Sequence, residues 1–156
     1  MRKACVLVAT ITAALALGVQ AARSEVVVNE SFPIAITVFV PCADGGAGEL
    51  VVLEGDLHVL LTITENANHL SIKNHSQPQG VSGTGLTTGD KYQGTGVTQD
   101  HFSANRGAET FTFVNNFRVI GQGPGNNFLV HQVFHVTINA NGEVTGTVDN
   151  FSVECK

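Results

Sequence analysis

A regular alternation of apolar and polar residues between positions 49 and 64 constrains the fold more than any other feature of the chain. In an extended backbone every second side chain points to the same side. One side of this stretch is then apolar apart from one glycine, and the other side is mostly polar. A period of two with one apolar side predicts a β-strand that covers a hydrophobic core. The apolar side consists of Val51, Leu53, Gly55, Leu57, Val59, Leu61 and Ile63.

An asparagine-rich turn at residues 65–68 leads from this stretch into a second extended segment, which predicts an antiparallel hairpin over residues 49–76. A symmetric turn centred between Asn66 and Ala67 places His58 opposite His75, and opposed residues have Cβ atoms about 4.5–5.5 Å apart. The two imidazoles are therefore weak candidates for metal ligands. Because their side of the hairpin is otherwise polar, a solvated surface pair is the preferred interpretation, and no metal site is predicted.

The rest of the chain is also extended in pattern. A glycine-rich segment, residues 77–96, lacks the lysine of a phosphate-binding loop and indicates bulged strands and tight turns. The Asn-Gly pair at 141–142 is typical of a type I′ hairpin, and no amphipathic helix is evident. The other segments with strand-like alternation are 25–40, 109–120, 128–139 and 143–154.

These segments predict an all-β domain, an antiparallel meander of about eight strands. Strands of 11–16 residues are long compared with the usual length of about 5–6. Long tilted strands suit a closed barrel of eight strands, so a calycin-like barrel is expected, with a β-sandwich as the alternative. No second domain is evident, and the domain is expected to span residues 22–156.

Residues 1–21 have the pattern of a secretory signal peptide. A basic start, Arg2 and Lys3, precedes an apolar run that is too short for a membrane span, and small residues follow near Ala21. We therefore expect a secreted or periplasmic protein without a membrane span.

The net charge excludes some partners. Removing Arg2 and Lys3 from the eight basic residues leaves six against thirteen acidic ones, a net charge of −7 with histidine neutral. An acidic domain without a basic run is not expected to bind nucleic acid.

Two cysteines remain once the predicted signal peptide is removed, Cys42 and Cys155. In an exported protein such a pair predicts a disulfide. This bond would stabilise the fold by about 4–5 kcal/mol in the chain-entropy description. Two free thiols that await a metal or a partner are the alternative.

Several short patterns resemble a group of small exported bacterial proteins of unknown function. The resemblance implies a compact secreted β domain and no catalytic residues. One departure is the loop at residues 43–47, which is longer here. The patterns are Val40-Pro41-Cys42 followed by Gly48-Glu49, then Gly55-x-x-His58, Gly83-x-Gly85, Thr88-Gly89-x-x-Tyr92, and Asn139-Ala-Asn-Gly-Glu-Val-Thr145 near a terminal cysteine.

The sequence gives little support for catalysis or for metal binding. His131 and His135 would share a zinc ion on a helix, but their surroundings favour a strand, on which they lie about 13 Å apart. Glu54 and Asp56 have a spacing of about 6.6 Å on one strand face, which suits glycoside chemistry but is usually a solvated pair. No nucleophile motif is present, and no cofactor is predicted.

The predicted interior suggests a binding function. Its stripes are apolar, with two amides among phenylalanines, and an eight-stranded barrel is wide enough either to be filled or to hold one small ligand. We therefore predict a secreted binding module for an apolar or amphipathic small molecule. A packed interior without a ligand is the competing interpretation, and a small enzyme or a structural, adhesive surface domain are alternative functions. The oligomeric state is left open. The predicted ligand-binding residues are Phe111, Asn115, Phe117, Gln132 and Phe134.

Overall fold

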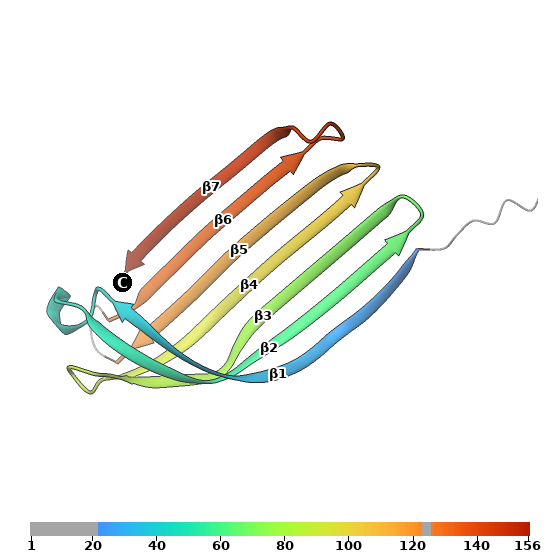
Figure 1. Ribbon diagram of the computed structural model, residues 1–156. Coiled ribbons are helices and arrows are strands. Elements are labelled where there is room, and N and C mark those ends of the chain that lie inside the picture. Colours follow the sequence, from blue (N-terminus) through green and yellow to red (C-terminus); the bar gives the residue numbers. More distant parts are fainter. Residues whose placement is uncertain (1–21, 123–125) are drawn as a thin grey trace, which may run out of the picture.

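The computed structural model describes residues 22–122 and 126–156, so the predicted signal peptide lies outside the described residues. The chain forms one antiparallel sheet of seven strands in sequence order (Figure 1). A single 3₁₀ turn, Asp44–Gly46, follows the first strand. The strands are β1 (Arg23–Val40), β2 (Glu49–Asn66), β3 (His69–Gly85), β4 (Lys91–Asn105), β5 (Ala108–Gly121), β6 (Phe128–Ile138) and β7 (Val144–Cys155).

The predicted all-β antiparallel meander is therefore confirmed, whereas closure into a barrel is not. Each strand pairs only with its neighbours in sequence, and β1 and β7 form the two edges of an open sheet. The described residues form seven strands rather than about eight. The glycine-rich segment, where bulged strands and tight turns were expected, supplies the end of β3, a turn and the start of β4.

The register of the central hairpin differs from the symmetric prediction. Asn66 pairs with His69, so the turn holds only Ala67 and Asn68, and the Asn68 N–H donates to the Asn66 side chain at 3.0 Å. This tighter turn shifts the pairing by two residues. His58 faces Gln77, and the predicted pairing with His75 is wrong.

The sheet has two chemically distinct faces, because directly opposed residues on neighbouring strands share a face. The face that carries Leu53 is called the apolar face, and the opposite one the polar face. All the phenylalanines of β4, β5, β6 and β7 lie on the apolar face, as the pairing of Phe102 with Phe111 and of Phe113 with Phe134 illustrates. All six histidines lie on the polar face, as follows from the strand registers.

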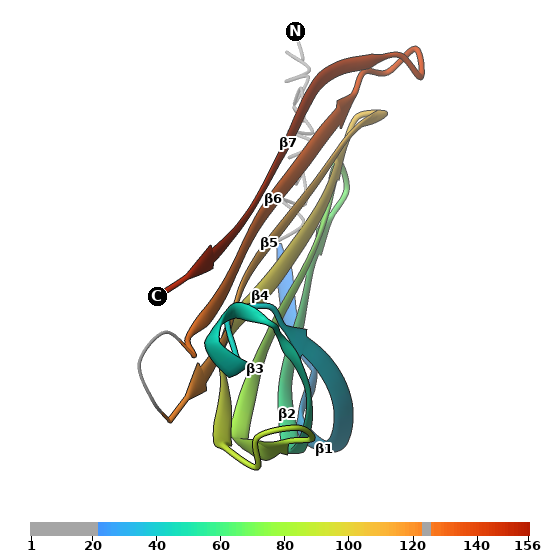
Figure 2. The same ribbon diagram turned by 90° about the vertical axis from the view of Figure 1, so that its left-hand side faces the viewer.

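One end of the sheet folds over its own apolar face, as Figures 1 and 2 show for the end of β1 and the start of β2. A register shift between Glu54 and Asp56 places a bulge in β3, where Gly80 and Val81 together lie opposite Gly55 of β2. A Cβ at Gly55 would lie 2.6 Å from the Val81 Cα, so only glycine permits this close approach.

A disulfide fixes the folded-over end. The predicted bond between Cys42 and Cys155 is present, with a Cα–Cα distance of 5.6 Å. Backbone hydrogen bonds between Asn127 and Lys156 hold the end of the chain beside the start of β6. We call this the disulfide end of the sheet, and the end with the turn at Ala67 the open end.

The buried core is confined to the disulfide end. Among the described residues its hydrophobic members are few, and they surround the bulge and the disulfide. Beyond this core the apolar face continues toward the open end, where its side chains are partly exposed. The core members are Val40, Ala43, Val51, Leu53, Val81, Tyr92, Val119 and Phe128.

Candidate apolar binding surface

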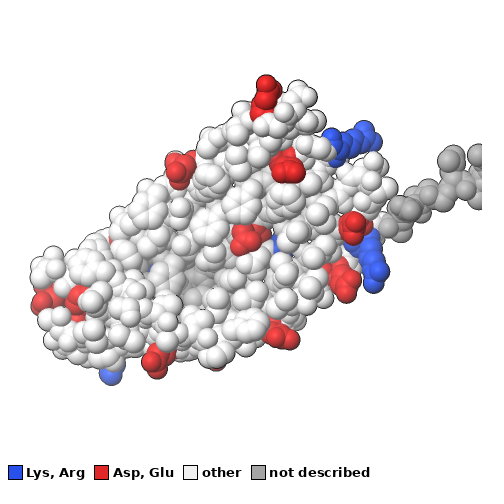
Figure 3. All heavy atoms as spheres, viewed as in Figure 1, with Lys and Arg blue, Asp and Glu red and all other residues white. Residues whose placement is uncertain are grey.

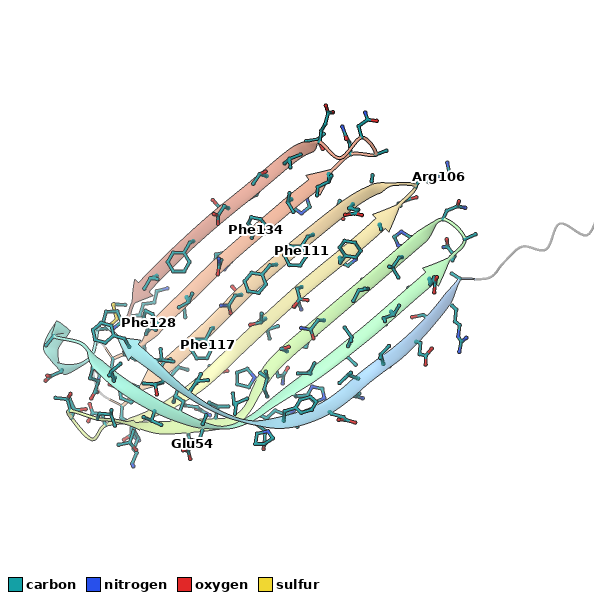
Figure 4. All side chains as sticks on the ribbon, viewed as in Figure 1. Glu54, Arg106, Phe111, Phe117, Phe128 and Phe134 are labelled. Atoms are coloured by element: carbon teal, nitrogen blue, oxygen red, sulfur yellow. A yellow bond between two sulfur atoms is a disulfide. The ribbon has the colours of Figure 1, made fainter. Side chains whose placement is uncertain are left out.

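The five residues predicted to bind a ligand lie together on the apolar face of β5 and β6. Asn115 pairs directly with Gln132, and Phe117 is the next residue on the same face toward the disulfide end. Phe111 and Phe134 lie on the other side of the two amides, with ring centroids 6.2 Å apart. Figure 4 shows Phe111, Phe117 and Phe134 along these strands. The alternation in the sequence therefore identified their shared face, although they were expected to line the inside of a barrel.

The surface has an aromatic part near the open end. Phe102 on β4 lies opposite Phe111, and Phe113 lies opposite Phe134, so four rings occupy adjacent positions. All four are intermediate in burial. The Phe111 and Phe134 rings meet at 52°, a tilted arrangement that aromatic pairs favour. Ile72 extends this apolar area beside Phe102.

A polar belt crosses the sheet between these rings and the core. The Thr98 hydroxyl donates to the Asn115 side-chain oxygen at 3.0 Å. In the neighbouring row, which continues across β5 and β6 as Phe113 and Phe134, the Asn74 amide donates to the Asp100 carboxylate at 2.9 Å. Asn115 is thus held by Thr98, a partner that sequence reasoning did not identify.

Charge is sparse on this face. Figure 3 looks onto it and shows mostly uncharged atoms, with acidic groups mainly toward the outline. From the strand registers, the acidic residues on this side include Glu65 and Glu109 near the open end, Asp100 opposite Phe113, and Asp149 opposite Phe134. The surface is therefore amphipathic, with an apolar field bordered by amides and a few carboxylates.

The interior at the disulfide end is packed rather than hollow. Six hydrophobic residues there are fully buried, and Phe117 packs against the core while staying partly exposed. The disulfide end therefore contains a small buried core. The predicted ligand-binding residues lie mostly outside it, on an open surface and not in a cavity.

The weak metal candidates are not brought together. The His58 Nε2 lies 2.9 Å from the Asn29 side chain on β1, whereas the Gln99 amide on β4 donates to the His75 Nδ1 at 3.0 Å. The two rings thus engage strands on opposite sides. No group of three or more metal-binding side chains exists within the described parts of the chain. His131 and His135 both lie on β6, where the strand spacing keeps them apart.

A buried carboxylate cluster at the disulfide end was not predicted. Glu49 is 2 % exposed and accepts hydrogen bonds from the Thr87 and Thr88 N–H groups, the Thr88 hydroxyl at 2.8 Å and the Tyr92 hydroxyl at 2.7 Å. Burial alone would raise the pKa of Glu49, but these donors outweigh it and lower the pKa to about 2. Burial and the Glu49 charge raise the pKa of Tyr92.

The available signal for this cluster was the set of short patterns containing Gly48-Glu49 and Thr88-Gly89-x-x-Tyr92. The structure joins the two patterns through the Glu49 carboxylate, which ties the start of β2 to the turn before β4. Because its oxygens already accept four hydrogen bonds, this carboxylate is suited to holding the fold rather than to proton transfer.

Comparisons with known proteins give no assignment. No protein-family model matches the chain, and no significant match to a curated protein or to a solved structure is found. No helix in the described chain has the length and hydrophobicity needed to cross a membrane.

Proposed function

We propose that this protein is an exported binding module that takes up an apolar or amphipathic small molecule on the open part of its apolar face. The observation that carries the proposal is the continuous field of Phe102, Phe111, Phe113 and Phe134 in a single-layered sheet. The rings are only partly buried, and contiguous apolar surface that remains accessible marks binding sites in soluble proteins. The disulfide is consistent with an extracellular or periplasmic location.

The chemistry of the surface favours an amphipathic ligand. Aliphatic or aromatic parts would lie on the phenylalanine rings, each worth about 1.5–3 kcal/mol when fully covered. A polar end would reach the amides of Asn115 and Gln132, in the way that small-molecule sites use a few polar groups to fix orientation. An affinity on the order of 10 μM is expected for a molecule that covers several rings.

The test is a titration of the folded, oxidised protein with a fatty-acid probe and an environment-sensitive dye. Phe134→Asp places a charge beside Phe111 and Phe113 and should weaken binding about tenfold or more. Val133→Asp is the matched control, because Val133 is the preceding residue of the same strand and lies on the polar face. It should bind the probe like the wild type.

Two results would contradict the proposal. One is the absence of saturable binding by the wild type, and the other is an equal loss in both variants, since the face would then not matter. Sedimentation at the same protein concentrations separates probe binding from self-association through the same face. We also propose that the chain belongs with the small exported β proteins that its short patterns resemble.

A further inference from the structure

The polar face of the central strands is free of carboxylates, although the protein is acidic. The acidic residues of β3 to β6 are Asp100 and Glu109, and the registers place both on the apolar face. The polar face of the same strands carries three permanently charged cations and five histidines. These are Lys73, Lys91, Arg118, His69, His75, His101, His131 and His135.

Within this region, two rows of side chains frame a hollow of about 520 Å³. The first row runs across β2, β3 and β4 as Leu60, His75 and Gln99, and the second as Thr62, Lys73 and His101. Between them lies the row that contains Asn74 and Asp100, whose side chains belong to the apolar face, so their backbones form the floor.

The frame offers hydrogen-bond donors, and no carboxylate on its face of the sheet pairs with them. Across the described residues the ion pairs are Arg23 with Glu25 and Lys156 with Glu154, so the Lys73 ammonium has none. Because the Gln99 amide donates to the His75 Nδ1, neutral His75 carries its proton on Nε2. The His101 Nε2 contacts the Ser71 hydroxyl at 2.9 Å, so Nδ1 is the ring nitrogen that remains for a ligand.

We propose that this hollow binds a small oxyanion, the carboxylate, phosphate or sulfate group of a ligand, between Lys73, His75 and His101. An ammonium and two imidazoles can supply several charge-assisted hydrogen bonds to oxygens of one anion. A metal cation fits less well, because Lys73 would repel it and no carboxylate of the frame could neutralise it. The site lies on the face opposite the phenylalanines and is independent of the function proposed above.

The surroundings of His101 make the binding dependent on pH. Burial lowers the pKa of His101, and the positive charges of Lys73 and His69 on β3 lower it further. Its neighbour on β5 is the uncharged Thr112. The negative charge of an anion in the hollow acts in the opposite direction to these cations and favours the protonated form of the His101 ring. Binding should therefore be tighter at roughly pH 5.5 than at pH 8.

The experiment is an NMR titration of the oxidised protein with sodium phosphate, sulfate and acetate at constant ionic strength, followed through the histidine ring signals. We expect saturable shifts of His75 and His101, with a dissociation constant on the order of 1 mM for the preferred anion. Lys73→Met should weaken this binding at least fivefold. Lys91→Met is the matched control and should have no effect, because Lys91 is a cation of the same face outside the frame.

Each outcome decides the proposal. A response to phosphate and sulfate but not acetate supports a site for tetrahedral anions, and a response to acetate alone supports a carboxylate site. Shifts that never saturate with any of the three anions would overturn it. So would equal losses in the Lys73→Met and Lys91→Met variants, which would indicate unspecific attraction. Phe134→Asp should leave the titration unchanged, which keeps this site separate from the apolar surface.

Discussion

At the scale of single residues, Glu49 shows how a buried charge holds two distant segments together. Its carboxylate accepts hydrogen bonds from Thr88 and Tyr92, and a hydrogen bond to a charged group contributes about 1.5–3 kcal/mol. Glu49→Gln replaces one acceptor oxygen by a donor that faces other donors. We expect it to lower the free energy of unfolding by about 3 kcal/mol at neutral pH. Thermal unfolding followed by circular dichroism measures this loss.

The pH dependence of stability should follow the same residue. The pKa of Glu49 is lowered to about 2 from an ordinary value of 4.5, so the folded state favours the ionised form. Its contribution is complete above the ordinary pKa and is lost as the pH falls from 4.5 toward 2. The difference in melting temperature between the wild type and Glu49→Gln should therefore shrink over this range. Glu54→Gln, at an exposed position, is the control. A difference that stays constant down to pH 2 would contradict this role.

Single residues also show where sequence reasoning succeeds. The disulfide was predictable because only two cysteines remain in the expected mature chain. The burial of Glu49 was not predictable, because glutamate is usually exposed. Its hydrogen-bond donors at Thr87 and Thr88 also lie far from it along the chain.

At the scale of elements, alternation identified the faces of the strands but not their register. A shift by two residues keeps every side chain on its own face, so the sequence pattern of β2 and β3 fits both registers. The turn decides between them, and here it holds only Ala67 and Asn68. For this reason the phenylalanine surface was predicted correctly while the pairing of His58 was not.

The observed register predicts where a metal site can be built. Gln77 lies opposite His58, so Gln77→His places two imidazoles at directly opposed positions with Cβ atoms about 4.5–5.5 Å apart. Nickel should then stabilise the variant by about 2.7 kcal/mol when its concentration is 100 times the dissociation constant. Thermal unfolding with and without nickel checks this. Equal stabilisation of the wild type, through His58 and His75, would instead support the symmetric register.

At the scale of the whole molecule, strand number determines how the sheet can end. In an antiparallel meander the first and last strands run in opposite directions only when the number of strands is even. With seven strands, β1 and β7 run in the same direction, so the sheet cannot close by one more antiparallel pairing. The sequence could not decide this, because the glycine-rich segment fits either one strand or two strand ends. The disulfide links the two edge strands, β1 and β7, and it lies at one end of the sheet only.

The disulfide should therefore control the folded-over end more than the rest of the sheet. Cys42 and Cys155 are 113 residues apart in sequence, and a loop of this length stabilises by about 4–5 kcal/mol in the chain-entropy description. Cys42→Ser combined with Cys155→Ser should lower stability by about this amount. Because Val40 and Phe128 of the core lie next to the two cysteines in sequence or in register, amide protons of the core should lose their protection from hydrogen exchange first. Amides of β3 and β4 near the open end, which pair through Ile72 and Phe102, should keep most of theirs until global unfolding. Hydrogen exchange measured by NMR on both proteins separates the two regions. A uniform loss of protection over the whole sheet would show that the two ends unfold as one unit and that the disulfide has no local role.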